Sequence, residues 1–145
     1  MTALQAVPSG REVQSARTAR TIAAATTTYT KAKEIVITVA GGYNIKYRLV
    51  TDNGTSGGVY GLVYRIRNGV ATAVGTENQN GSTAGTDTLY VEDIWGWEVG
   101  DSCAIYCKSP GGSSAGQVKG FVLGAELAPA PPGIPYGRVV TDTNV

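Results

Sequence analysis

Apolar and polar residues alternate along much of this chain, which is the period-two pattern of half-buried strands. The clearest case is the segment YNIKYRLV (43–50), in which every second residue is apolar. The same pattern is present in EIVITV (34–39). The glycine pair Gly41-Gly42 lies between the two segments and predicts a turn that joins two strands.

A second pair of strands is predicted around an Asn-Gly dipeptide. The segment VYGLVYRIR (59–67) alternates and is followed by Asn68-Gly69. This dipeptide is the strongest short hairpin signal, because both turn positions need a positive φ. We therefore expect 70–75 to return as the partner strand. The alternation in 59–67 places four apolar side chains on one side: Tyr60, Leu62, Tyr64 and Ile66.

The rest of the sequence also consists of short strand-like segments separated by loops or turns. Short strands are predicted over 88–93, 101–108 and 117–123, with loops or turns over 52–58, 77–85, 95–100 and 110–116. Seven or eight strands at hairpin spacing predict an all-β fold, an antiparallel β-sandwich that is jelly-roll-like, with extended N- and C-terminal arms. A chain of 145 residues has room for one such domain. We divide it into a basic N-terminal arm (1–20), the sandwich (21–124) and a proline-rich C-terminal arm (125–145).

The N-terminal arm carries the charge bias of the chain. The first 33 residues contain five basic residues and one acid, a net charge of +4, so the remainder carries −3 of the total of +1. We expect Arg11, Arg17 and Arg20 to meet an acidic protein surface. The charge is spread out and no aromatic residues are interleaved to stack on bases, so we do not expect nucleic-acid binding. Both a helical and an extended conformation fit residues 11–25.

The C-terminal arm is rich in proline, which lacks an amide hydrogen and fixes φ. This composition predicts a polyproline-like strap that rises about 3.1 Å per residue and reaches an adjacent subunit. A disordered tail is the alternative. The partner-binding residues that we assign to this arm are Pro129, Pro131, Pro132, Pro135 and Tyr136.

The chain lacks the side chain that most often serves as a catalytic base. It contains no histidine, which excludes a Ser/His/Asp or Cys/His nucleophile within one chain. Cys103 and Cys107 lie four residues apart on a predicted strand, about 13 Å, which is beyond disulfide reach. We interpret them as buried core thiols, because a zinc site would lack its other soft ligands. We predict no enzymatic activity, no cofactor and no metal site.

One acidic and aromatic cluster deserves a separate interpretation. Trp95 and Trp97 lie among the acids of VEDIWGWEVGD (91–101). The cluster fits a sugar-binding cleft, in which the indoles stack on sugar rings, and its carboxylates also fit a calcium site. We favour a third interpretation, in which the tryptophans anchor the corner in the core and the acids face water.

Three stretches resemble small β-sandwich modules of bacteriophage virion proteins, of the capsid decoration, tail and fibre type. They are ARTIAAATTTYTKAKEIVITVAGGYNIKYRL, VYRIRNGVATAVGT and VEDIWGWEVGDSCAIYCK, and the resemblance covers about residues 19–123. It implies a structural or attachment role and no active site. The first ten residues lack the features of a secretory signal, and no run reaches about 18 apolar residues. We therefore expect synthesis in a host cytoplasm, no membrane span, and a final location in the virion.

These observations predict a capsid decoration or cement protein, or a similar head or tail accessory, whose arms bind the particle. Its partners would be other virion proteins and further copies of itself, most simply in a trimer. A carbohydrate-binding or host-attachment module, using Trp95, Trp97 and exposed tyrosines, is the alternative. A self-polymerising filament subunit, in which an arm completes a neighbour's sheet, is the second alternative.

Overall fold

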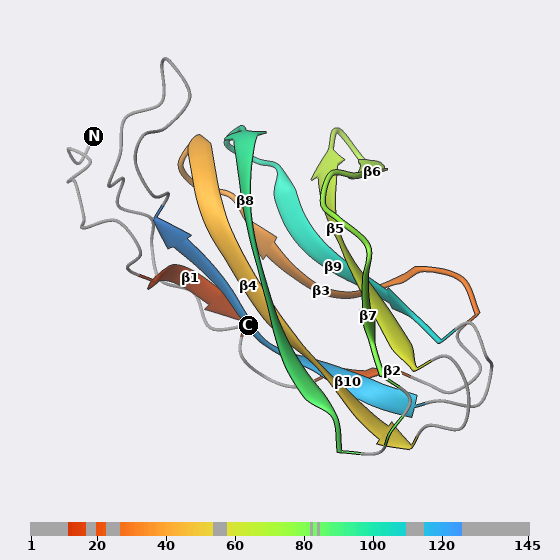
Figure 1. The fold of residues 1–145 in the computed structure, drawn as a ribbon. Helices are drawn as coiled ribbons and strands as arrows, with labels where there is room; N and C mark the ends of the chain where they lie inside the picture. Colours follow the sequence, from red (N-terminus) through yellow and green to blue (C-terminus); the bar gives the residue numbers. More distant parts are fainter. Residues whose placement is uncertain are drawn as a thin grey trace.

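The computed structural model describes residues 12–16, 20–22, 27–53, 58–81, 83, 85–109 and 115–125. Throughout these ranges the regular elements are strands, and they form two antiparallel sheets of five strands each (Figure 1). The all-β, antiparallel prediction is therefore confirmed. None of the described residues forms a helix long and apolar enough to cross a bilayer.

The first sheet has the order β1-β10-β4-β8, and β2 also pairs with β10. Its strands are β1 (Glu12–Ala16), β2 (Arg20–Ile22), β4 (Gly41–Asn53), β8 (Asp87–Trp97) and β10 (Ala115–Ala125). The second sheet has the order β3-β9-β5-β6, and β7 also pairs with β5. Its strands are β3 (Thr30–Val36), β5 (Val59–Arg67), β6 (Val70–Ala73), β7 (Asn78–Asn80) and β9 (Ser102–Lys108).

The strand pairs are nested around one turn. β5 pairs with β6 and β7, β4 with β8, β3 with β9, and β10 with β1 and β2. Two further pairings, β10 with β4 and β9 with β5, join these pairs into the two sheets. The innermost turn is Asn68-Gly69, with φ values of 53° and 78°. The hairpin that the Asn-Gly signal predicted is therefore present.

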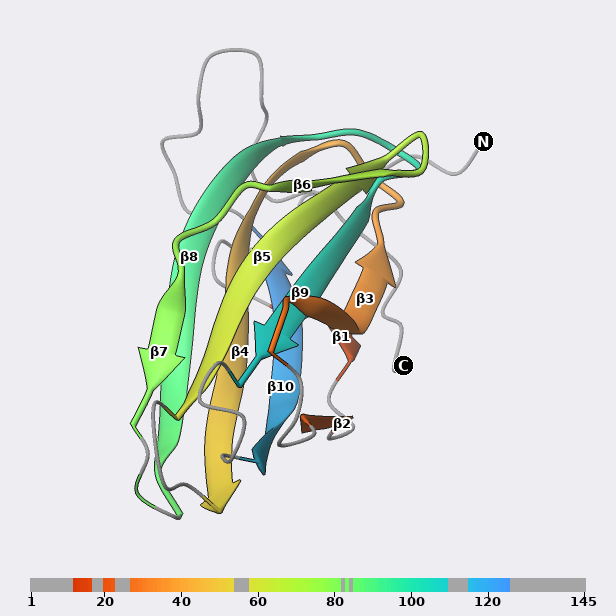
Figure 2. The same cartoon turned by 90° about the vertical axis from the view of Figure 1, so that its right-hand side faces the viewer.

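The core lies where the two sheets face each other (Figures 1 and 2). One hydrophobic cluster contains buried side chains from strands of both sheets. The alternating positions Tyr43, Ile45, Tyr47 and Leu49 all belong to it, as the alternation predicted, and so do the thiols of Cys103 and Cys107. Ile37 and Val39 are buried as well, although β3 ends at Val36.

Three segments differ from the sequence-based expectation. β8 continues through Trp97 where a turn was predicted, because a positive φ at Gly96 (87°) lets the strand bulge and continue. The bulge is visible in the register, since Gly41 pairs with Trp97 but Tyr43 with Ile94. β7 lies inside the predicted loop 77–85. β1 and β2 are extended and belong to the first sheet, so Glu12–Ala16 of the predicted N-terminal arm forms a strand.

A half-buried ion pair, in which only Asp101 is fully buried, closes the end of the molecule where β5 meets the β8–β9 turn. Arg67 donates from Nε to Asp101 Oδ1 (2.9 Å) and from Nη2 to Oδ2 (2.7 Å), and also to the Gly96 carbonyl (2.8 Å). The Glu98 amide donates to the same carboxylate at 2.8 Å. These bonds, above all those from Arg67, hold the pKa of Asp101 below its ordinary value.

This shift predicts a pH dependence of stability. Because the folded-state pKa of Asp101 is lowered, its contribution is complete above the unfolded-state pKa of about 4 and is lost as the pH falls through the folded value. Asp101→Asn should therefore lower the free energy of unfolding most at neutral pH. Urea unfolding at pH 7, 5 and 3 should show the difference from the wild type shrinking with acidity. An equal difference at all three pH values would contradict this role.

Candidate functional site

The outer side of the second sheet carries a group of tyrosines. In β5 the side chains of Val59 and Val63 point into the core, so Tyr60 and Tyr64, which alternate with them, lie on the opposite side. Together with Tyr29, Tyr106 and Lys108 they form what we call the tyrosine face. Figure 2 looks onto this sheet, with β5 and β9 toward the viewer.

The rings of the tyrosine face contact one another. Tyr64 and Tyr106 are stacked, with centroids 4.0 Å apart and planes inclined by 25°, and Tyr29 lies 6.2 Å from Tyr64. Leu62 is only 8% exposed although it lies outside the core cluster. Since its neighbours on the strand, Tyr60 and Tyr64, share its side of the sheet, the tyrosine rings cover it. Tyr29, Tyr64 and Tyr106 therefore form a half-buried group of aromatic rings in mutual contact.

A charged pair borders this surface. The Lys108 ammonium lies 4.5 Å from the Tyr29 ring centroid and 5.3 Å from that of Tyr60, within the range of cation–π attraction. Lys108 Nζ is also 3.6 Å from Glu77 Oε2, the atom to which the Tyr29 hydroxyl donates at 2.5 Å. Burial, followed by the hydrogen bond to Glu77, raises the pKa of Tyr29. Tyr29 is thus fixed in place and neutral.

Three hydroxyls of the tyrosine face have no hydrogen-bond partner within the described part of the chain. Elsewhere the tyrosine hydroxyls are used internally: Tyr47 accepts from Asn78 (2.8 Å), and Tyr90 donates to the Gln79 carbonyl (2.8 Å). By contrast, the hydroxyls of Tyr60, Tyr64 and Tyr106 make no hydrogen bond to any described residue. An aromatic surface whose hydroxyls are not used by the described fold is suited to binding.

The two tryptophans do not form such a surface. Trp97 is 2% exposed and belongs to the core, where its Nε1 donates to the Ile94 carbonyl at 3.1 Å. The Arg65 guanidinium lies 5.8 Å from its ring. Trp95 packs directly over Gly42, since a Cβ built there would approach the indole to 2.1 Å. Trp97 is therefore inaccessible to a sugar in this structure.

The acidic residues near the tryptophans have structural partners. Glu92 accepts two hydrogen bonds from the Thr76 amide and one from its hydroxyl, at 3.0–3.1 Å. Asp93 accepts from the Asn44 side chain at 2.7 Å. Glu92 and Asp101 are thus bonded within the fold, where we had expected the acids to face water. Among the described residues there is no cluster of three potential metal ligands.

The thiols are buried and free. Cys103 and Cys107 have no disulfide partner. Burial raises the pKa of both, that of Cys107 to about 12, so neither is a thiolate near neutral pH. Their interpretation as core thiols is confirmed.

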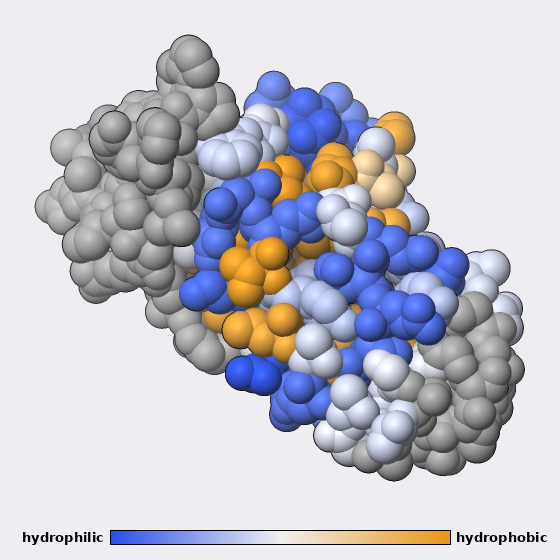
Figure 3. Space-filling view, viewed as in Figure 1, coloured by the Kyte–Doolittle hydropathy of each residue, from blue (hydrophilic) through white to orange (hydrophobic). Residues whose placement is uncertain are grey.

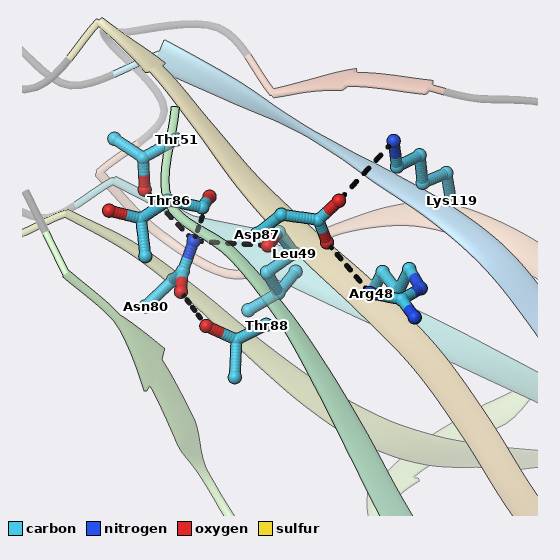
Figure 4. Close-up of polar contacts among 8 residues, drawn as sticks. All are labelled: Arg48, Leu49, Thr51, Asn80, Thr86, Asp87, Thr88 and Lys119. Atoms are coloured by element: carbon cyan, nitrogen blue, oxygen red, sulfur yellow. Dashed lines mark hydrogen bonds and ion pairs between the residues drawn. The ribbon is translucent and has the colours of Figure 1, made fainter. Parts of the chain in front are cut away.

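A polar network lies at the other end of the molecule, where β4, β7 and β8 meet (Figure 4). Asn80 is buried, and its amide nitrogen donates to the carbonyls of Leu49 and Thr86 and to the Thr51 hydroxyl. Its Oδ1 accepts from Thr88. Beside it, on the surface, one carboxylate bridges two strands, with Asp87 lying 3.2 Å from Arg48 and 3.6 Å from Lys119. Both groups therefore join neighbouring strands.

The outer side of the first sheet is mixed in character. Figure 3 shows small apolar patches separated by polar side chains over β8 and β4. Leu89 and Val91 of β8 are 44% and 52% exposed there, while Arg48 and Lys46 lie opposite them on β4.

Most of the predicted arm residues lie outside the described residues. This applies to Arg11 and Arg17 in the N-terminal arm and to Pro129, Pro131, Pro132, Pro135 and Tyr136 in the C-terminal arm. Arg20 is the first residue of β2. The tyrosine face was only partly anticipated, because the alternation grouped Tyr60 and Tyr64 of β5 but not Tyr29, which precedes β3, or the two residues from β9. Comparison with known families finds no family model that matches this chain, and no curated protein matches it either.

Proposed function

We propose that this chain is a virion structural protein of jelly-roll type, most concretely a capsid decoration or cement protein or a similar head or tail accessory. It binds the particle through its arms and stabilises it, as a homo-oligomer that is most simply a trimer. It is made in the host cytoplasm and is not an enzyme.

The nested strand order is the observation that carries the proposal. If β1 with β2, and β6 with β7, each count as one interrupted strand, eight strands remain, four in each sheet. A jelly roll is a double-sheet fold of eight strands, and viral capsid proteins and lectins use it. The resemblance of residues 19–123 to phage virion modules favours the capsid-associated role over the others.

The position of the arms supports a bridging role. β1 and β2 pair along one edge of β10, and the C-terminal arm follows the end of β10 directly. Both arms therefore leave the first sheet near the same strand. Segments that order on binding can cover large surfaces, which suits a protein that joins neighbours on a particle.

Deletion of each arm tests this function. Residues 1–11 and 126–145 contribute none of the strands that the structure describes, so we expect the described sheets to persist without them. We expect each deletion to weaken co-sedimentation with virions from the same source by at least tenfold in apparent affinity. The control is Val70→Ser, an exposed change on β6 that should leave binding unchanged. Full-strength binding by both deletion variants would exclude the arm mechanism.

A carbohydrate-binding or host-attachment role remains the second candidate, and the tyrosine face is what favours it. Aromatic rings exposed on a sheet can stack on sugars, and lectins also use jelly rolls. A glycan array probed with the wild type and Tyr64→Ser tests it. Specific binding that Tyr64→Ser abolishes would support this candidate. The filament alternative predicts fibres of the purified protein in electron micrographs.

A further inference from the structure

We propose that the tyrosine face is the docking site for the proline-rich C-terminal arm (126–145) of a second copy of this chain. The inference rests on the proposed function, in which arms bridge subunits, and it adds the surface that receives one arm. The ligand is thus an extended polyproline segment, recognised by aromatic rings and hydroxyl donors.

The face has the chemistry that such a segment needs. Polyproline recognition relies on grooves lined by aromatic side chains, against which proline rings pack. The stacked pair Tyr64 and Tyr106 supplies two such rings, and Leu62 forms an apolar floor below them. The hydroxyls of Tyr60, Tyr64 and Tyr106, which bond to none of the described residues, can donate to peptide carbonyls.

The arm has the complementary chemistry. Its sequence PAPPGIPY (129–136) contains the proline spacing PxxP twice, at 129–132 and at 132–135. A polyproline helix has no internal hydrogen bonds, so its carbonyls are free to accept from tyrosine hydroxyls. Proline also limits the entropy that the arm loses on docking, because its φ is already fixed.

Chain length favours a neighbour as the receiver. β10 ends at Ala125, which pairs with Tyr43 in the first sheet, whereas the tyrosine face is the outer side of the second (Figure 1). Only residues 126–128 precede Pro129, and three residues span at most about 11 Å. Stacked sheets lie about 10 Å apart, and the arm would still have to round an edge to reach its own tyrosine rings. Because so few residues precede the first proline, we assign the arm to the tyrosine face of another copy.

A peptide-binding measurement tests the inference. The receiver is the full chain with Pro129, Pro131, Pro132 and Pro135 replaced by alanine, so that its own arm cannot compete. The probe is a fluorescent peptide of residues 126–140. We expect saturable binding, a loss of about 30-fold when Tyr64→Ser is added, as for a central aromatic contact, and no binding of the peptide with four Pro→Ala changes. Leu89→Ser, an exposed change on the opposite sheet, is the matched control and should leave affinity unchanged.

Sedimentation velocity of the full chain gives a second, independent readout. The wild type should form oligomers, and the four-alanine variant, whose changes lie outside the described fold, should dissociate at concentrations at least tenfold higher. This measurement does not use Tyr64→Ser, so it decides the question even if that variant fails to fold. Unchanged oligomers in the four-alanine variant would overturn the inference, as would peptide binding that Tyr64→Ser leaves intact.

The outcome is separable from that of the proposed function. Co-sedimentation with virions that persists while the peptide fails to bind would reject the docking site and keep the virion role. Peptide binding without any virion association would reject the virion role and keep the docking site. Glycan binding lost in Tyr64→Ser, with no peptide binding, would assign the face to carbohydrate instead.

Discussion

Trp97→Ala is expected to lower the free energy of unfolding by about 3–5 kcal/mol, the usual cost of truncating a large buried aromatic residue to alanine. Trp97 is among the largest fully buried side chains, and its indole fills the core at the end of β8. Domains of this size are stable by only about 5–15 kcal/mol, so the loss is a large part of the total. Thermal and urea unfolding of the two proteins measure it directly.

A control on the same strand isolates the effect of burial. Val91 lies on β8 but is half exposed, so Val91→Ala should change stability by no more than about 0.5 kcal/mol. Trp97→Ala with a stability close to that of the wild type would mean that Trp97 does not fill the core.

The result also bears on function. Because Trp97 supports the core, any loss of ligand binding in Trp97→Ala would follow from unfolding and would say nothing about sugar contact. Tyr64→Ser, which changes a partly exposed ring of the tyrosine face, is therefore the informative substitution for both the glycan and the arm hypotheses.

The second large effect is expected at Asn80, which is 1% exposed. Asn80→Leu keeps a similar shape but leaves the carbonyls of Leu49 and Thr86 without the donor that now lies 3.0 and 2.9 Å away. An unsatisfied buried polar group costs about 1–3 kcal/mol, so we expect a total loss of about 3 kcal/mol. Urea unfolding monitored by tryptophan fluorescence measures it.

Asn80→Asp adds a pH-dependent test of the same contacts. A carboxylate at this position would face two carbonyl oxygens, which favours the protonated form and raises its folded-state pKa. The variant should therefore be least stable at neutral pH and should recover as the pH falls toward about 4. Asn78→Leu on the same strand, which loses the single bond to Tyr47, is the control, with an expected cost of about 1 kcal/mol. Equal losses for Asn80→Leu and Asn78→Leu would contradict the network's role.

Local pattern predicted the elements whose two sides differ in polarity. In β4 every second residue is apolar, so the buried side could be assigned before the fold was known. The Asn68-Gly69 turn was equally predictable, because few residues tolerate a positive φ at adjacent positions. Both signals act over a few residues and need no knowledge of the partner strand.

Where both sides of a strand are apolar, the pattern was insufficient. β5 alternates tyrosine and leucine with valine and glycine, and only packing decides that Val59 and Val63 face the core while the tyrosines face outward. β7 is polar throughout and pairs with β5. Its last residue, Asn80, forms hydrogen bonds with Leu49 on β4, with Thr86 just before β8 and with Thr88 on β8. The end of β8 was misassigned because a glycine such as Gly96 is as typical of a turn as it is of a bulge.

The sequence by itself thus determined an all-β chain with buried thiols, no histidine chemistry, and two compositionally distinct arms. Only the tertiary structure decided that β1 and β2 extend the first sheet and that Tyr29, Tyr64 and Tyr106 meet on one surface. The physical reason is that these residues come from strands distant in sequence. Their proximity depends on the pairing of β3, β9 and β5, which is fixed by the packing of the whole core.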